Sequence, residues 1–170
     1  MKANRKAISV VLILASLILA TYVANRIPGQ WDATGENIYT LSEGSRDIVQ
    51  KLEEPVTLKL YFNRSMEGLP IRIKNYATRV EDLLRQYSRA GGNLINLRIV
   101  DPEPDSDQEQ EAIQAGLSPQ TVSTGENLFF GLVAIQADST EVIPFFNFDR
   151  ESFLEYDISQ LIYQVQQLDK

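Results

Sequence analysis

Residues Val56–Phe62 read VTLKLYF, a stretch that predicts a β-strand. Apolar and polar residues alternate along it, which is the period of a β-strand that packs one face on a core. The alternation places four apolar side chains on one face: Val56, Leu58, Leu60 and Phe62. A second strand is predicted at Leu94–Val100 (LINLRIV), which closes at Asp101-Pro102. The sequence therefore predicts a sheet at the centre of the domain.

The segment between these two strands has the period of a helix. Its apolar residues recur at helical spacing: Tyr76, Val80, Leu83, Leu84 and Tyr87. Gly91-Gly92 ends this helix, because glycine readily adopts the backbone conformation that closes many helices. A shorter helix is expected before the first strand, since Thr40 or Ser42 caps an apolar stripe that ends at Glu53-Glu54-Pro55.

The second half of the chain predicts a helix, a hairpin and a last helix. Ser106-Asp107-Gln108-Glu109 is a capping box, and the helix that it opens stops near Gly116. Three further elements complete the pattern: a strand at Leu128–Ala137, a strand at Glu141–Phe146 and a helix from about Phe153 to Leu168. A tight turn at Asp138-Ser139 makes the two strands an antiparallel hairpin.

The resulting order is a helix followed by β-α-β-α-β-β-α. We predict a small mixed sheet with helices on both faces, thioredoxin-like but without a redox motif, because the chain has no C-x-x-C. Ser118-Pro119 falls shortly before the third strand, where that fold usually carries a cis-proline. A fragment of a larger doubly wound sheet has the same order and stays open.

Composition limits the functions of the chain. Its 170 residues suit one domain, and its formal charge is −7. Three basic residues, Lys2, Arg5 and Lys6, lie in the first six positions, which leaves 13 basic residues against 23 acidic ones. A formal charge of −10 after Lys6 repels phosphate backbones, so nucleic-acid binding is not expected.

The chain has no cysteine and no histidine. Thiolate nucleophiles, thiolate zinc sites, Ser-His-Asp triads and imidazole ligands are therefore excluded. Carboxylate, lysine and tyrosine chemistry remain, or no chemistry. We expect a protein with no catalytic residues, no cofactor and no metal.

The first residues predict a membrane anchor. Residues 7–24 read AISVVLILASLILATYVA, and as a helix they span about 27 Å, close to the thickness of the bilayer hydrocarbon. The basic residues 1–6 place the N-terminus in the cytoplasm by the positive-inside rule. Residues 25–41 then form a stalk, and residues 42–170 form an extracytoplasmic domain. A cleaved signal peptide is the alternative, but the apolar run is long for one, and Tyr22-Val23-Ala24 puts a bulky residue at the −3 position.

The most prominent charged feature is a run of acids: Asp101, Glu103, Asp105, Asp107, Glu109 and Glu111. No register of this run supplies the glycine and glutamate of a calcium loop, so we interpret it as carboxylates gathered at a helix N-terminus. The lysines beyond the anchor form no S-x-x-K motif, and Lys51, Lys59 and Lys74 are expected to be solvated. The acid pairs Asp149/Glu151 and Glu155/Asp157 are a weak signal for glycosidase chemistry.

Phe145-Phe146-Asn147-Phe148 places three aromatic residues in four positions. Core packing is the favoured interpretation. The alternative is that Phe146 and Phe148 contribute to a protein contact or line a ligand pocket.

An ordered set of short motifs resembles a known family. The set begins with Trp31-Asp32-Ala33-Thr34 and Tyr39-Thr40-Leu41-Ser42, continues through Glu54-Pro55-Val56, Tyr61-Phe62, Gly91-Gly92, Asp101-Pro102, Gly116 and Gly131, and ends with Glu155-Tyr156-Asp157. It resembles the gliding-motility-associated ABC transporter auxiliary components (GldG-like), over roughly residues 25–165. Ala33 departs from the leucine of that family. Its members also usually continue past this last motif into a second extracytoplasmic domain and a second membrane span.

The resemblance implies a non-catalytic auxiliary subunit in the bacterial inner membrane. Its partners would be a permease, that permease's cytoplasmic ATPase and, through residues 7–24, membrane lipid. The resemblance also suggests partner-contact or motif roles for a set of residues: Trp31, Asp32, Tyr39, Leu41, Ser42, Asp101, Pro102, Glu155, Tyr156 and Asp157. Two other functions stay open, a membrane-anchored carboxylate-dependent hydrolase of the cell envelope and a ligand-binding domain that feeds a transporter.

Overall fold

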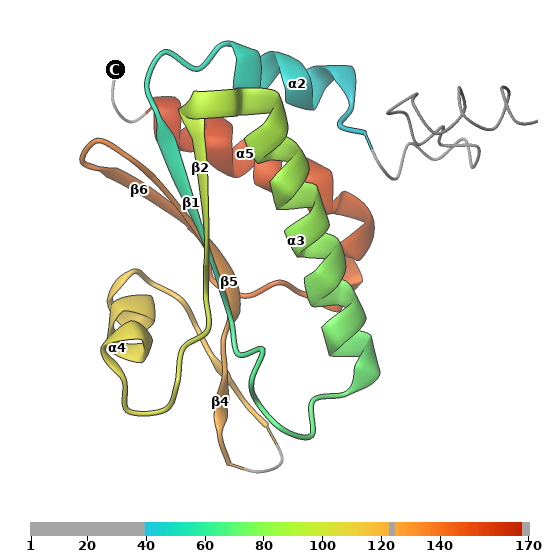
Figure 1. Cartoon of the computed structure of the whole chain (residues 1–170), viewed down its shortest axis with the longest axis vertical. Helices are drawn as coiled ribbons and strands as arrows, with labels where there is room; N and C mark the ends of the chain where they lie inside the picture. Colours follow the sequence, from blue (N-terminus) through green and yellow to red (C-terminus); the bar gives the residue numbers. More distant parts are fainter. Residues whose placement is uncertain (1–39, 123–124, 168–170) are drawn as a thin grey trace, which may run out of the picture. The chain divides into compact units, whose positions relative to one another are not determined.

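Strand β1 (Val56–Phe62) lies inside a four-stranded sheet in the computed structural model, which describes residues 40–122 and 125–167 (Figure 1). The strand order is β2-β1-β5-β6, with β2 (Ile95–Val100), β5 (Phe130–Gln136) and β6 (Ser139–Ile143). β1 and β2 are parallel, while β5 is antiparallel to both β1 and β6. The described part of the chain is thus a mixed α/β domain, and the predicted fold class is confirmed at this level.

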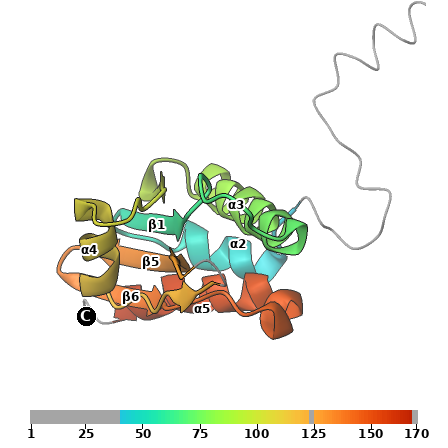
Figure 2. The same ribbon diagram turned by 90° about the horizontal axis from the view of Figure 1, so that it is seen from below.

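Helices cover the two faces of the sheet unequally. α2 (Glu43–Gln50), α3 (Ile71–Gly91) and α5 (Leu154–Gln167) lie on one face, and α4 (Asp107–Gln114) lies on the other (Figure 2). The larger core fills the three-helix side and contains the apolar face of β1 that the alternation predicts. A smaller cluster lies under α4, where Tyr61 and Val133 pack against Ala112 and Leu117.

The ends of the helices follow the predicted capping chemistry. Ser42 caps α2 by accepting a hydrogen bond from the backbone N–H of Ser45, so Ser42 rather than Thr40 is the N-cap. Ser106 caps α4 in the same way through the N–H of Glu109. α3 ends at Gly92, whose φ of 54° lies in the region that glycine adopts most easily.

The hairpin differs from its prediction in extent. The expected strand Leu128–Ala137 is interrupted at Phe129, because Asn127–Leu128 forms a separate short strand, β4, paired with β3 (Gln120–Thr121). Gln136 pairs with Ser139, so the connecting residues are Ala137 and Asp138, one position earlier than predicted. β6 therefore begins at Ser139 and ends at Ile143, before the phenylalanines.

The prediction of a cis peptide bond before Pro119 is wrong. All described peptide bonds are trans, including the one between Ser118 and Pro119. An X–Pro bond favours the trans form by about 0.5–1 kcal/mol unless the surrounding packing requires the cis form.

The predicted anchor, residues 7–24, and most of the predicted stalk lie outside the described residues. Within residues 40–122 and 125–167, no helix is both long and apolar enough to cross a bilayer. Leu41, at the end of the predicted stalk, is buried in the core of the domain.

Candidate functional site

A cleft lies between α2 and the beginning of α5, and we call it the α2–α5 cleft. Its volume is about 440 Å³, and its walls carry hydroxyl, carboxylate and apolar groups. The residues that matter most to its chemistry are Ser42, Ser45, Ile48, Phe153, Glu155 and Tyr156. It therefore joins two segments that the sequence singles out separately, Leu41-Ser42 and Glu155-Tyr156.

Two aromatic side chains at this cleft are largely exposed. Phe153 is 56% exposed and Tyr156 is 62% exposed, although large apolar residues usually avoid water. The guanidinium of Arg150 lies 5.7 Å from the centre of the Phe153 ring. Exposed aromatic surface beside a hollow is typical of a protein-binding patch.

A hydrogen bond between distant parts of the chain closes one side of the cleft. The backbone N–H of Ser42 donates to Oε1 of Glu155 at 2.7 Å, across a separation of 113 residues. In a capping box, the acid that accepts from the N-cap residue comes from the same helix. Here α5 supplies that acid to α2, so the bond ties the start of one helix to the start of the other.

A chain of hydroxyl groups leads from the wall of the cleft to the buried Tyr87. The Oγ atoms of Ser42 and Ser45 are 3.0 Å apart, and those of Ser45 and Ser159 are 2.8 Å apart. The Ser159 Oγ lies 2.6 Å from the phenol oxygen of Tyr87 on α3, and that phenol donates to the backbone oxygen of Glu155. Burial raises the pKa of Tyr87 to about 12, against the opposing effect of these serines. The network fastens α2, α3 and α5 together.

Glu155 is an anion at neutral pH. Partial burial acts to raise the pKa of its carboxyl group, but hydrogen bonds from Ser45 and Ser42 outweigh that effect, and the pKa lies below its ordinary value. Glu155 is the only acidic or basic residue among those that line the cleft. The cleft thus combines one negative charge with exposed aromatic surface.

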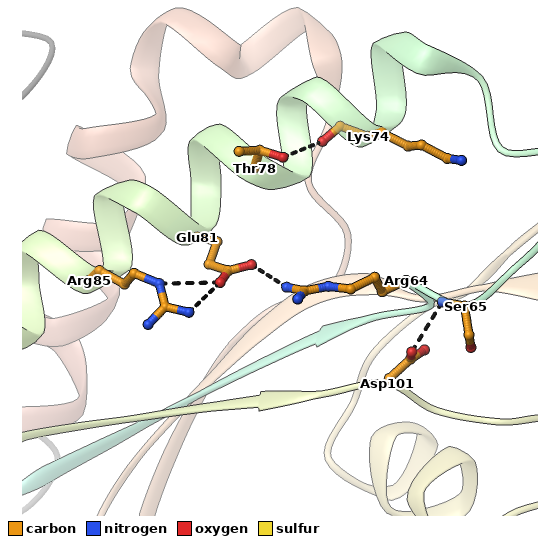
Figure 3. A network of polar contacts seen from close by, with 7 residues as sticks. All are labelled: Arg64, Ser65, Lys74, Thr78, Glu81, Arg85 and Asp101. Atoms are coloured by element: carbon orange, nitrogen blue, oxygen red, sulfur yellow. Dashed lines mark hydrogen bonds and ion pairs between the residues drawn. The ribbon is translucent and has the colours of Figure 1, made fainter.

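A second cleft, of about 370 Å³, lies where β1 and β2 end. The buried side chain of Asn63 forms its floor, donating to the backbone oxygen of Pro102 and accepting from the N–H of Phe129. Asp101 accepts a hydrogen bond from the N–H of Ser65 at 3.1 Å (Figure 3). The Asp101-Pro102 motif therefore fastens the end of β2 to the loop after β1.

An arginine network lies above this loop. Arg64 and Arg85 both donate to the carboxylate of Glu81 on α3, so the loop is held to the helix as well as to β2 (Figure 3). Such partly exposed ion pairs contribute little to stability individually, and their effect here is to fix the position of the loop.

Lys59 is not solvated as predicted. Its side chain is only 20% exposed, because α4 covers it and brings Oε1 of Glu111 within 2.6 Å of its ammonium group. The hydrogen bond from Lys59 is the main reason that the pKa of Glu111 falls below its ordinary value. Glu111, a member of the predicted acidic run, therefore serves as a counter-ion and not only as a charge near a helix end.

The phenylalanines of residues 145–148 mainly pack within the protein. Phe146 is buried, and its ring meets that of Tyr76 edge-on and that of Phe130 at a tilt. Phe148 is half-buried, with the guanidinium of Arg72 above its ring at 4.8 Å. Neither cleft is lined by these phenylalanines, so the favoured interpretation as core is confirmed for Phe146.

One acid of each pair suggested for glycosidase chemistry forms an ion pair with an arginine. Glu151 pairs with Arg79 at 3.2 Å, and Asp157 pairs with Arg150. Among the described residues, no group of three or more acidic side chains is arranged to hold a metal ion.

Sequence reasoning missed Phe153 and Ile48 as parts of a site. The buried face of α5 begins at Leu154, and Phe153 lies one residue before it, outside that face. This position could have indicated that Phe153 is exposed. The predicted contact residues Trp31, Asp32 and Tyr39 lie outside the described residues.

The sheet and its helices define a small mixed α/β domain with two surface clefts among the described residues. The chain belongs to the family described as Domain of unknown function (DUF7088), whose model matches residues 35–135. That range includes Ser42 and Asp101 but stops before Glu155. No curated protein and no solved structure matches this chain.

Proposed function

We propose that this protein is a membrane-anchored, non-catalytic auxiliary subunit of an ABC-type transport system of the gliding-motility type. It sits in the bacterial inner membrane through residues 7–24, with its N-terminus in the cytoplasm. Its extracytoplasmic domain binds the permease, and the ATPase joins the complex on the cytoplasmic side. The resemblance of the ordered motifs to GldG-like proteins supports this assignment.

The observation that carries the proposal is the composition of the α2–α5 cleft. Two motif segments, Leu41-Ser42 and Glu155-Tyr156, meet there through the hydrogen bond from Ser42 to Glu155. Phe153 and Tyr156 expose aromatic surface at the same place. A motif that only ordered a stalk would not need an exposed aromatic neighbour, whereas a docking surface would.

The topology supports the thioredoxin-like part of the proposal. A parallel β1–β2 pair joined through α3 is followed by the antiparallel β5–β6 hairpin and a last helix, as in a βαβαββα unit. The trans bond before Pro119 and the short β3–β4 pair depart from that pattern. In this reading the fold serves as a binding scaffold.

The hydrolase alternative receives less support. A general acid needs a carboxyl group with a raised pKa. The two carboxyl groups of the described chain whose pKa moves clearly, Glu111 and Glu155, both move down. The ligand-binding alternative needs a pocket lined by residues 145–148, and those side chains contribute to neither cleft.

Affinity purification of the tagged full-length chain from its own membranes tests the proposal. Mass spectrometry should identify a multi-span permease and an ATPase, together with peptides from residues 1–24 of this chain. The double variant Phe153→Ala/Tyr156→Ala should lose most of the permease. Ile113→Ala removes a similarly exposed side chain from α4 and should not. Recovery of the chain alone, without its first 24 residues, would contradict the proposal.

A further inference from the structure

We infer that the α2–α5 cleft receives a basic side chain, an arginine or a lysine, from an apolar segment of the partner. Glu155 would be its counter-ion, and Tyr156 and Phe153 would form its aromatic wall. The inference rests on the proposed function, because it names the chemistry of the partner at the same surface.

The charge of the cleft is unbalanced within the described chain. The neighbouring acids Glu151 and Asp157 each form an ion pair with an arginine. Glu155 forms none with any described residue, although it lies between them in sequence and is held in place by Ser42. A fixed and partly buried carboxylate without a cation is complementary to a basic group.

The aromatic side chains favour the same kind of ligand. A guanidinium or ammonium group binds over an aromatic face, most strongly where water is excluded. Two such contacts occur within the described part of the chain, with Arg72 over Phe148 at 4.8 Å and Arg150 near Phe153 at 5.7 Å. Tyr156 is 62% exposed, and its phenol interacts electrostatically with the guanidinium of Arg150, so a cation is already accommodated beside this side chain.

The cleft is large enough to admit one long side chain. About 440 Å³ lies near the lower end of the roughly 300–1,000 Å³ typical of pockets that enclose small ligands. Ile48 supplies apolar surface for the methylene groups of a long basic side chain.

Glu155→Gln is the variant that tests the inference. Glutamine keeps an oxygen that can accept the Ser42 N–H, so the tie between α2 and α5 is retained while the charge is removed. Glu53→Gln, on the exposed loop after α2, is the matched control. The full-length chain is used to capture the permease at about 50 mM and about 300 mM salt. We expect Glu155→Gln to weaken capture about tenfold at low salt and to reduce its salt dependence, while Glu53→Gln behaves as the wild type.

A small probe tests the cleft without the permease. N-acetyl-arginine amide at millimolar concentration should shift the backbone amide signal of Ser42 in nuclear magnetic resonance spectra of the full chain. N-acetyl-norleucine amide should not, and neither probe should act on Glu155→Gln. The absence of an arginine-specific shift up to about 10 mM would overturn the inference.

The two proposals fail in different ways. If Phe153→Ala/Tyr156→Ala loses the permease but Glu155→Gln captures it as the wild type does, the basic-group inference is wrong and the docking surface stands. If no permease is captured but arginine still binds through Glu155, the proposed function is wrong and the chemistry of the cleft stands. Capture of only a second copy of this chain, with no effect of Glu155→Gln, would overturn both.

Discussion

At the scale of single residues, Glu155 has two roles in this account. Its carboxylate accepts the first N–H group of the α2 cap, and the same carboxylate gives the cleft its charge. These roles can be separated, because hydrogen bonding needs an oxygen atom while recognition of a cation needs the charge.

The first prediction concerns the pH dependence of stability. Partial burial opposes ionisation of Glu155, but the hydrogen bonds hold its pKa in the folded state below the ordinary 4.5. Its stabilisation is therefore complete above pH 4.5 and is lost as the pH falls through the lower, folded-state value. At pH 7 we expect Glu155→Ala to lower the free energy of unfolding by about 1 kcal/mol, mostly through loss of a capping acceptor.

Urea unfolding of the wild type and both Glu155 variants between pH 3 and pH 7 measures this effect. The difference between the wild type and Glu155→Ala should shrink as the solution becomes more acidic. Glu155→Gln should lose less stability than the alanine variant, since it keeps the acceptor. A difference that stays constant down to pH 3 would contradict the account.

The second prediction concerns the buried tyrosines. Burial raises the pKa of Tyr76 and of Tyr87 to about 12 and also raises that of Tyr61. Because these pKa values are raised in the folded state, their contribution to stability is complete below pH 10 and is lost as the pH rises above it. Absorbance at 295 nm should therefore show that Tyr87→Phe removes at most about a tenth of one tyrosine's ionisation from the folded protein up to pH 11. In the urea-unfolded protein the same substitution should remove most of one tyrosine's signal at pH 11. A loss of that size in the folded protein would contradict the burial of Tyr87.

At the scale of the elements, most helices and strands could be predicted from hydrophobic period and capping residues. The alternation of Val56–Phe62 and the helical spacing up to Tyr87 both report directly on burial, so these predictions hold to within a few residues. The break at Phe129 could not be predicted. It depends on Asn63, which lies 66 residues away in the sequence. The side chain of Asn63 accepts a hydrogen bond from the N–H of Phe129, so this N–H does not pair with a neighbouring strand.

The candidate site was predictable only in part, for a similar reason. Ser42, Glu155 and Tyr156 could be singled out as motif residues, but their meeting depends on how α2 and α5 pack. Lys59 shows the same limit, because its place on the polar face of β1 was predictable while its cover by α4 was not. Residue type and spacing predict the structure of a single helix or strand. Contacts between elements can be known only once the fold shows how those elements pack.

The third prediction tests the packing of one strand against its neighbours. A Cβ atom added to Gly131 on β5 would lie 2.6 Å from Leu117 Cδ2 and 2.7 Å from the backbone oxygen of Ile143. Backbone atoms move less readily than side chains, so we expect Gly131→Ala to lower the free energy of unfolding by about 2–3 kcal/mol. Gly44→Ala in α2 is the control, because a Cβ there meets nothing within 4 Å and a helix favours alanine. Equal stabilities of the two variants, measured by urea unfolding, would contradict the packing of β5.

At the scale of the whole molecule, the proposed anchor precedes, along the chain, a domain that carries an exposed aromatic cleft. Residue 40, where the described chain begins, lies two residues before Ser42 at that cleft. The proposed anchor therefore leads to the domain through the same segment that forms part of the cleft. A partner in the same membrane would meet this surface at high local concentration, so moderate affinity would suffice.

Photo-crosslinking in the native membrane tests whether the α2–α5 cleft contacts the permease. The photoreactive residue p-benzoylphenylalanine replaces Tyr156 in the full-length chain, and replaces Ile113 on α4 in the control. We expect position 156 to crosslink to a multi-span permease and position 113 not to. Equal crosslinking from both positions, or no crosslink from position 156 to any membrane protein, would contradict this prediction.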